Sequence, residues 1–277
     1  MKKLTFQEPL VESDSVEVLS KKLIELAKEL TMANQELERI QWERSIMLAN
    51  ISHDLRAPIS AIRSAVDLLL SGHPLTKKEE EAAIKLIDRR TTTLQTMIQD
   101  MYLLFTLENN ELPLHYETVL ATPFFEEYFY NATMDQRYED KKMYLDLPED
   151  IKAFITIDIQ QMLRVLDNLF TNAAKYSPPH AKITLSIKPN TDESKLVIQV
   201  IDTGIGIPSD CLTKIFDRTY TVSMARTPES ATGSGLGLCI VKLIVEKFHG
   251  QVHCESQFGK GSTFTIMLPM EKGSTAL

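Results

Sequence analysis

Two asparagines and a lysine in the second half of the sequence have the spacing of one helical face. Residues 167–176 read Asp-Asn-Leu-Phe-Thr-Asn-Ala-Ala-Lys-Tyr. On a helix Asn168, Asn172 and Lys175 therefore follow one another at i, i+4 and i+7. Two amide oxygens and an ammonium group suit a hydrated Mg²⁺ ion and phosphates, because Mg²⁺ takes few protein oxygens and keeps water and phosphate as its other ligands. The alternative is a solvent-facing polar side whose apolar neighbours form core.

A second cluster, at residues 202–208, reads Asp-Thr-Gly-Ile-Gly-Ile-Pro and directly follows the apolar run 196–201. Asp202, at the end of an expected strand, can accept a hydrogen bond from an adenine amino group. Gly204 and Gly206 allow the backbone to approach a base or a sugar closely. A simple β-turn would also explain the Asp-Thr-Gly part on its own.

A third cluster, at residues 233–238, reads Gly-Ser-Gly-Leu-Gly-Leu and opens an apolar helix. Its GxGxG spacing is neither the dinucleotide-binding GxGxxG nor the P-loop pattern. A glycine-rich loop that runs into a helix N-terminus presents free N–H groups and the positive end of the helix dipole to phosphates. The preceding segment 223–232, with Ser, Thr and Pro among its residues, predicts a mobile lid over a nucleotide.

The first half of the sequence contains a histidine with a carboxylate beside it. Asp54 follows His53, and Pro58 lies five residues beyond the histidine. A carboxylate can hydrogen-bond one imidazole nitrogen, which fixes the tautomer and leaves the other nitrogen as a nucleophile. Pro58 predicts a bend, since it removes a helical hydrogen bond. A histidine on a helix is more often a plain surface residue, so the segment gains its weight from the three clusters.

An apolar seam leads up to this histidine. The seam residues alternate four and three apart, with one break at Arg44, which is a heptad pattern. They are Leu19, Leu23, Leu26, Leu30, Ala33, Leu37, Ile40, Met47 and Ile51. A second stripe follows the turn at 71–74, in a helix that starts near Thr76 with Glu79 as capping-box partner. Two helices around one turn form a hairpin, and two copies close a four-helix bundle. The pattern predicts a homodimeric coiled coil and bundle; the alternative is one long helix packed on its own domain.

From residue 111 the pattern becomes a mixture of short strands and helices, which predicts an α/β sandwich with a mostly antiparallel sheet. The expected strands are 112–119, 143–147, 153–157, 182–188, 196–201, 251–255 and 262–268, and the expected helices are 122–137, 159–175 and 237–248. The predicted organisation is an irregular N-terminus at 1–18, a coiled coil at 19–45, a dimerisation and phosphotransfer domain at 46–110, an ATP-binding domain at 111–272 and a tail at 273–277.

Composition excludes several classes. The net charge is −8 and no cluster of Lys and Arg occurs, which argues against nucleic acid as the main partner. The three cysteines form no CxxC pair, so a disulfide framework or cysteine metal site is not expected. No apolar run reaches the roughly 18–20 residues that span a bilayer. We expect a cytoplasmic protein, or the cytoplasmic portion of a longer membrane-bound protein.

In this order the clusters resemble those of the sensor histidine kinases of bacterial two-component systems, from about residue 45 onward. The matching segments are the H box at Ser52–Pro58, the N box at Asn168–Tyr176, the G1 box at Asp202–Pro208, the F box at Phe216–Arg218 and the G2 box at Gly233–Leu238. The C-terminal half also resembles the wider ATPase superfamily shared with chaperones, DNA gyrase and mismatch-repair proteins. The H box separates the kinases from these relatives.

The resemblance implies ATP and Mg²⁺ as cofactors and His53 as phosphoryl acceptor, with Asp54 as the assisting base. Asn172 would hold Mg²⁺, with Asn168 beside it, and Lys175 would meet phosphate. The other implied residues are Tyr176, packed on adenine; Asp202, at the adenine amino group; Gly204, Gly206, Gly233, Gly235, Gly237 and Leu238, which shape the pocket; Phe216, which anchors the lid; and Thr263, near the base.

The resemblance also implies a response-regulator receiver domain as partner and a separate or removed sensor domain. Ala57 departs from the family, which often carries Thr or Asn four residues after the acceptor to position water for dephosphorylating the regulator. The resemblance therefore leaves phosphatase activity open. Two other functions fit the residues less well: an ATP-binding dimeric scaffold without catalysis, and an ATPase without a histidine acceptor.

Overall fold

A computed structural model describes residues 12–109, 111–148, 152–218, 220 and 235–272 of the chain. Within that part, the chain divides into two compact units at His53 and Asp54. The first unit contains the N-terminal part of helix α1 (Glu12–Leu69). The second contains the rest of α1, helix α2 (Lys77–Glu108) and an α/β region. Helix α1 begins at Glu12. The expectation of an irregular segment is therefore wrong for residues 12–18, because the helical hydrogen bonds continue on the N-terminal side of the heptad seam.

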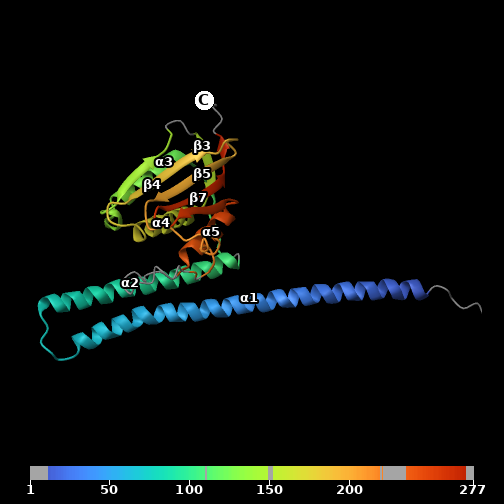
Figure 1. Ribbon diagram of the computed structural model, residues 1–277, viewed down its shortest axis with the longest axis horizontal. Coiled ribbons are helices and arrows are strands. Elements are labelled where there is room, and N and C mark those ends of the chain that lie inside the picture. The colour runs from blue at the N-terminus through green and yellow to red at the C-terminus, as the bar shows by residue number, and fades with distance from the viewer. Residues whose placement is uncertain (1–11, 110, 149–151, 219, 221–234, 273–277) are drawn as a thin grey trace, which may run out of the picture. The chain divides into compact units, whose positions relative to one another are not determined.

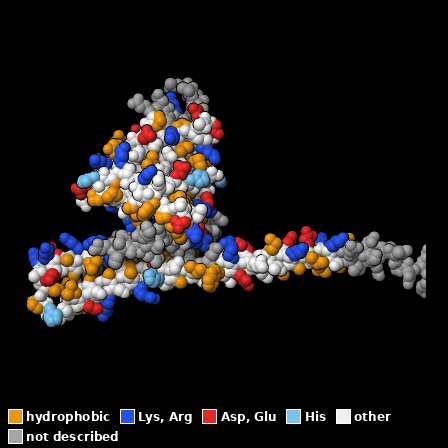
Figure 2. All heavy atoms as spheres, viewed as in Figure 1, with side chains coloured by type: hydrophobic (Ala, Val, Ile, Leu, Met, Phe, Trp, Pro, Cys, Tyr) orange, Lys and Arg blue, Asp and Glu red, His pale blue; other side chains and the backbone are white. Residues whose placement is uncertain are grey.

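The seam on α1 is largely exposed within the single chain. Leu23, Leu26 and Leu30 are 60%, 54% and 64% exposed, and the orange side chains along the long helix are visible in Figure 2. An apolar stripe of this length is stable when a partner covers it. The seam includes Met47, whose side chain lies outside the described residues. The helix continues through Pro58, which is buried.

The start of α2 is fixed by a complete capping box. The Thr76 side chain accepts a hydrogen bond from the Glu79 backbone N–H, and the Glu79 carboxylate accepts one from the Thr76 N–H at 2.8 Å. Two of the backbone donors that a helix start leaves unpaired are thereby satisfied. The sequence expectation for this cap is confirmed. At the other end of α2, Leu104 and Leu107 are almost fully buried.

The α/β region has two sheets with helices packed on them (Figure 1). Its elements are β1 (Glu117–Leu120), α3 (Ala121–Thr133), the 3₁₀ helix η1 (Gln136–Tyr138), β2 (Lys142–Asp146), β3 (Ala153–Ile157), α4 (Ile159–Lys175), β4 (Lys182–Pro189), β5 (Lys195–Asp202), α5 (Gly237–Lys247), β6 (Gln251–Gln257), β7 (Gly261–Pro269) and β8 (Glu271–Lys272). The larger sheet has the order β2-β4-β5-β7-β6, and the smaller has β1-β3-β8.

All but one of the strand pairings are antiparallel, as expected; β2 pairs with β4 in parallel, with Lys142 opposite Lys182. Helix α4 contacts α5, β4 and β5, whereas α3 contacts β1, β2 and β3. The core lies between these helices and the sheets. Its largest members are Phe125, Phe170, Ile155, Ile157, Met162, Leu166, Leu169, Ile183 and Leu185, each less than 2% exposed.

Two expected elements are corrected. The strand expected at 112–119 is only the four-residue β1, because the first part of that run includes Pro113, which cannot donate to a ladder. The helix expected at 122–137 ends at Thr133, and a 3₁₀ turn follows, capped by Asp135. The short strand β8 was not expected, because two residues are too few for a pattern to emerge.

Candidate nucleotide-binding site

A cavity of about 560 Å³ lies in the second unit. Its walls come from α2, α4, the segment after β5, the N-terminus of α5 and β7. This size falls within the usual range for small-molecule sites. The cavity brings together most of the residues that the sequence singled out, which are far apart along the chain: Asn168, Asn172, Lys175, Tyr176, Asp202, Gly206, Gly235, Gly237 and Leu238.

Helix α4 presents the polar stripe to the cavity. It starts at Asp158, whose carboxylate accepts from the Gln161 N–H at 3.1 Å, and its opposite side is buried core. Asn168, Asn172 and Lys175 all line the cavity, as the i, i+4, i+7 spacing predicts. The Asn168 amide nitrogen donates to the Arg164 carbonyl at 2.9 Å, which directs its oxygen toward the loop at Gly237. The polar face is therefore a cavity wall.

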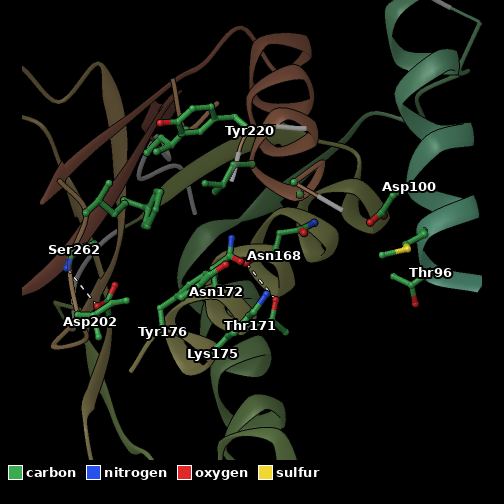
Figure 3. Close-up of a pocket in the computed structure, with 18 of the residues that line it drawn as sticks. Thr96, Asp100, Asn168, Thr171, Asn172, Lys175, Tyr176, Asp202, Tyr220 and Ser262 are labelled. Carbon is green, nitrogen blue, oxygen red and sulfur yellow. Dashed lines mark hydrogen bonds between the residues drawn. The ribbon is translucent and has the colours of Figure 1, made fainter. Parts of the chain in front are cut away.

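Asp202 is the buried charge of the site. Its side chain is 7% exposed, and its Oδ1 accepts hydrogen bonds from the Gly204 N–H at 2.8 Å and the Ser262 N–H at 3.3 Å; Figure 3 shows the contact with Ser262. Burial raises the pKa of Asp202 above its usual value, while these hydrogen bonds act in the opposite direction. The two donors hold one oxygen, so the carboxylate has a fixed orientation at the cavity.

Glycine is required at two positions for reasons of space. Gly206 has a φ of 67°, and a Cβ there would collide with the Gln257 carbonyl. A Cβ on Gly204 would lie 2.7 Å from the Ser177 hydroxyl and would collide with the Tyr176 carbonyl. Gly204 therefore supports the wall from behind and is not itself among the cavity-lining residues. Gly233 and the expected lid at 223–232 lie outside the described residues.

Tyr176 caps the C-terminus of α4, and its ring lies 5.1 Å from the Lys175 ammonium nitrogen. A cation over a ring face is attracted by the ring quadrupole. Tyr176 and Lys175 therefore form one wall that combines a flat aromatic surface with a positive charge. Both side chains are labelled on α4 in Figure 3, on the same side as Asn172.

Two expected residues are placed differently from the sequence prediction. Thr263 does not line the cavity, whereas its neighbours Ser262 and Phe264 do. Alternate residues of a strand face opposite sides, so the cavity face of β7 carries the residues on either side of Thr263. Phe216 does not line the cavity either; its ring packs edge-on against Phe264 at 6.4 Å. It supports a wall residue from outside.

Sequence reasoning missed the apolar part of the wall and the contribution of α2. The missed apolar and aromatic residues are Ile205, Ile207, Pro208, Ile215, Tyr220, Phe258 and Phe264, and the missed α2 residues include Thr92, Thr93, Thr96 and Asp100. The threonines had no distinguishing pattern. Ile205 lies between the two G1 glycines and Ile207 follows the second, so both could have been inferred from that motif. Figure 3 shows Thr96 and Asp100 on a separate helix facing the α4 residues.

His53 and Asp54 lie in the last third of α1. His53 is exposed and Asp54 is half-buried, whereas the seam residue Ile51 is 6% exposed. The acceptor candidate thus lies away from the buried side of the helix, as expected from the sequence. Ala57, four residues on, is exposed as well.

The described residues contain no group of three His, Cys, Asp or Glu side chains that could hold a metal ion by themselves. Amide oxygens of asparagine together with phosphate and water remain a suitable set for Mg²⁺. Among the described helices, none is long and apolar enough to cross a membrane.

Two family models match the chain. One, described as His Kinase A (phospho-acceptor) domain, matches residues 43–110, and the other, described as Histidine kinase-, DNA gyrase B-, and HSP90-like ATPase, matches residues 157–272. The chain belongs to the two-component sensor histidine kinases. The fold class expected from the sequence, a helical hairpin followed by an α/β sandwich, is confirmed.

Individual relatives agree. The chain is 33% identical over 239 residues to the sensor histidine kinase WalK of Bacillus subtilis, covering 86% of this chain and 38% of that protein. It is 31% identical over 236 residues to the sensor protein kinase WalK of Staphylococcus epidermidis, covering 85% and 38%. The chain thus spans less than half the length of these relatives.

Solved structures share the fold. The histidine kinase AdeS of Acinetobacter baumannii superposes with a TM-score of 0.61 at 22% identity, over 79% of this chain and 98% of that one. The histidine kinase ThkA, solved in complex with the response regulator protein TrrA, gives 0.63 at 22% identity, over 80% and 60%. At these identities the likeness concerns the fold alone.

Proposed function

We propose that this chain uses ATP to phosphorylate its own His53 and then passes the phosphoryl group to an aspartate of a response-regulator receiver domain. The observation that carries the proposal is the single cavity in which Asn168, Asn172 and Lys175 on one wall meet Asp202 on another. One wall suits a triphosphate and the other suits a base. His53, on a separate helix, would be the phosphoryl acceptor. A protein that only binds a nucleotide would not need such a residue.

The base would lie at the end of the cavity formed by Asp202, Ile205 and Phe258. A carboxylate accepts from the adenine amino group, and the apolar side chains cover the ring faces. Asp202 has one oxygen occupied by backbone donors. Its other oxygen, Oδ2, would read the base, and a base with a carbonyl at that position, such as guanine, would be repelled.

The phosphates would lie along α4 and the N-terminus of α5. Lys175 provides a positive charge, and Gly235 and Gly237 bring backbone N–H groups of the α5 start to the cavity. Asn172, with Asn168 beside it, would hold Mg²⁺ through amide oxygens. When bound, Mg²⁺ neutralises the charge that develops on the transferred phosphoryl group. The protein's own contribution is to orient the chain of phosphates and to exclude competing water.

At the acceptor, Asp54 would hold one nitrogen of His53 so that the other attacks. The exposed position of His53 leaves the imidazole accessible to a phosphate donor and later to a regulator domain. Chemistry of this kind depends mainly on positioning, since little covalent work is left to the protein. Ala57 has no polar group to orient a water molecule, so we propose that dephosphorylation of the regulator by this chain is slow or absent.

Two partners complete the proposal. The exposed seam supports a homodimer in which two copies of α1 cover each other. The related kinase ThkA was solved with a response regulator protein, which supports a receiver domain as the acceptor of the phosphoryl group.

Labelling with ATP that carries a radioactive γ-phosphate tests the proposal. We expect an acid-labile, base-stable label on the wild type and its loss in His53→Gln. His73→Gln is the matched control, because His73 is another exposed histidine, in the turn after α1; it should keep the label. A chain that binds ATP without becoming labelled would be a scaffold, and ATP turnover without a label would indicate an ATPase. Either result contradicts the proposal.

A further inference from the structure

Two ion pairs join α2 to the nucleotide-binding region. Asp100 lies 2.6 Å from Arg164 of α4, and Glu108 lies 2.7 Å from Arg218. The Asp100 and Arg164 side chains are only 13% and 31% exposed. The Arg63–Asp67 pair on α1, in contrast, is 77% and 56% exposed. Shielded charges are screened less by salt than exposed ones, so the α2 pairs are the stronger candidates for holding two elements together.

Each arginine is attached to backbone that forms the cavity. Arg164 lies one turn before Asn168, and its carbonyl accepts the Asn168 amide hydrogen bond. Arg218 lies two residues before Tyr220, a wall residue. Asp100 is itself a wall residue. The acidic side chains of α2 therefore contact two segments that carry wall residues, Asn168 in one and Tyr220 in the other.

Helix α2 also forms part of the wall. Thr92, Thr93 and Thr96 line the cavity opposite the α4 stripe. Between the two acidic residues, Leu104 and Leu107 are almost fully buried, and α2 as a whole contacts α5. An apolar contact flanked by ion pairs fixes where the nucleotide-binding region lies along α2 better than an apolar contact alone. A shift along the helix axis would separate each acidic side chain from its arginine.

The position along α2 matters for the reaction. Asp54 lies 15 residues before the end of α1 at Leu69, and Thr92 lies 15 residues after the start of α2 at Lys77. Helices rise by about 1.5 Å per residue, so in a hairpin such residues lie at a similar height above the turn. A nucleotide held at Thr92 and Thr96 would therefore lie at the height of the Asp54 turn of α1, which is where the proposed acceptor segment is found.

We infer that Asp100 and Arg164 are positioning residues for self-phosphorylation: their ion pair holds the nucleotide cavity on α2 at the height of the acceptor segment, with Glu108 and Arg218 as a second attachment. This inference rests on the proposed function. Arg164 is not among the residues that line the cavity, so the pair can be broken at Arg164 without changing a side chain of the wall. Breaking the pair in this way should slow transfer to His53 and leave the affinity for the nucleotide unchanged.

A charge-reversal series tests the inference. Asp100→Arg and Arg164→Asp each place like charges opposite each other, and the double variant restores an ion pair with reversed polarity. We expect each single variant to lower the first-order rate of His53 labelling at saturating ATP by about tenfold, and the double variant to recover most of it. In Arg164→Asp, whose altered side chain does not line the cavity, the equilibrium affinity for ATP should stay within about twofold of the wild type. Arg63→Asp, which disrupts the exposed pair, is the control and should label at the wild-type rate.

Hydrogen exchange provides a measurement that does not depend on phosphorylation. Backbone amides of residues 96–107 should exchange faster in the single variants and return toward wild-type protection in the double variant. If the wild-type chain acquired no label from ATP, the proposed function would be contradicted. Hydrogen exchange in the same variants would still test whether the Asp100–Arg164 pair holds α2 against α4. Unchanged labelling rates and exchange in the single variants would overturn the inference. The inference would also be overturned if the fold-losses of labelling rate in the two single variants multiplied in the double variant, or if Arg164→Asp lost ATP affinity in parallel with its labelling rate.

Discussion

Helix α4 and the N-terminal part of α1 both carry a long apolar stripe, and the surroundings of the two stripes are opposite. On α4 the stripe residues Val165, Leu169 and Phe170 have no exposed surface. On α1 the seam residues Leu23, Leu26 and Leu30 are more than half exposed. The first stripe finds its partner within the chain, and the second does not within the described residues. The α/β region should therefore fold on its own contacts, whereas the seam should gain stability from association.

The largest expected effect is a loss of core volume on α4. Phe170→Ala removes a ring that packs edge-on against Tyr128 and Tyr138. Truncating a fully buried Phe costs about 3–5 kcal/mol, so the midpoint of urea unfolding, followed by far-ultraviolet circular dichroism, should fall sharply. Leu26→Ala on the seam is the matched comparison. It should leave this transition in place and instead raise the concentration at which the chain dissociates in sedimentation experiments. Equal losses of unfolding free energy in the two variants would contradict the comparison.

An intermediate effect is expected from the buried charge of the α/β region. Asp202→Asn keeps an oxygen for the Gly204 and Ser262 donors but presents an NH₂ group to the base. We expect ATP affinity to fall by about 10- to 100-fold, since a mismatched buried polar group costs about 1–3 kcal/mol. The thermal midpoint should not fall, because the substitution removes a buried charge. Asp67→Asn, at an exposed site on α1, should change neither quantity.

The pH dependence of the wild type follows from the same residue. The pKa of Asp202 is raised in the folded state because burial disfavours the carboxylate. The folded chain therefore holds this proton more readily than the unfolded chain, so the contribution of Asp202 to stability declines as pH rises from the ordinary value of 3.8 through the raised pKa. Binding has the opposite sign: ATP affinity, measured by calorimetry, should weaken as pH falls through the raised pKa. This weakening should be absent in Asp202→Asn.

The smallest effect concerns the start of α2. Thr76→Ala removes the side-chain half of the capping box and should lower the unfolding free energy by about 1 kcal/mol. Thr91→Ala is a suitable control, since the Thr91 hydroxyl donates to the Ile87 carbonyl within the helix and caps nothing. Hydrogen exchange at residues 77–80 should rise in the first variant. No change there would mean that tertiary contacts, rather than the cap, hold the helix start.

The sequence patterns predicted elements well where periodicity and capping agree. Helix α4 has the predicted bounds because Asp158 caps its start and its amphipathic pattern continues to Lys175. The capping box at Thr76 was found for the same reason. The face of a strand that lies toward the site was harder to predict. Thr263 was expected near the base, but its neighbours Ser262 and Phe264 are the residues that line the cavity. A one-residue shift reverses the face of a strand, and no motif in β7 marks which face is which.

The contribution of α2 to the site could not be read from the sequence. Asp100 and Glu108 look like ordinary charges on a helix surface, and their significance depends on two arginines 64 and 110 residues further along the chain. Nothing local distinguishes them from Arg63 and Asp67, which also form an ion pair but remain exposed. Pairs of this kind become visible when the fold brings distant segments together.

Gly206, which lines the cavity, and Gly204, which lies behind its wall, also bear on chemical inhibition. Substitution of Gly204 or Gly206 would drive a side chain into backbone carbonyl groups of Tyr176 or Gln257. Because those carbonyls belong to elements that also shape the pocket, a change that excludes a competing compound would distort the room for ATP as well. A compound that contacts mainly Gly206 and the Asp202 carboxylate would therefore leave the protein few routes to resistance.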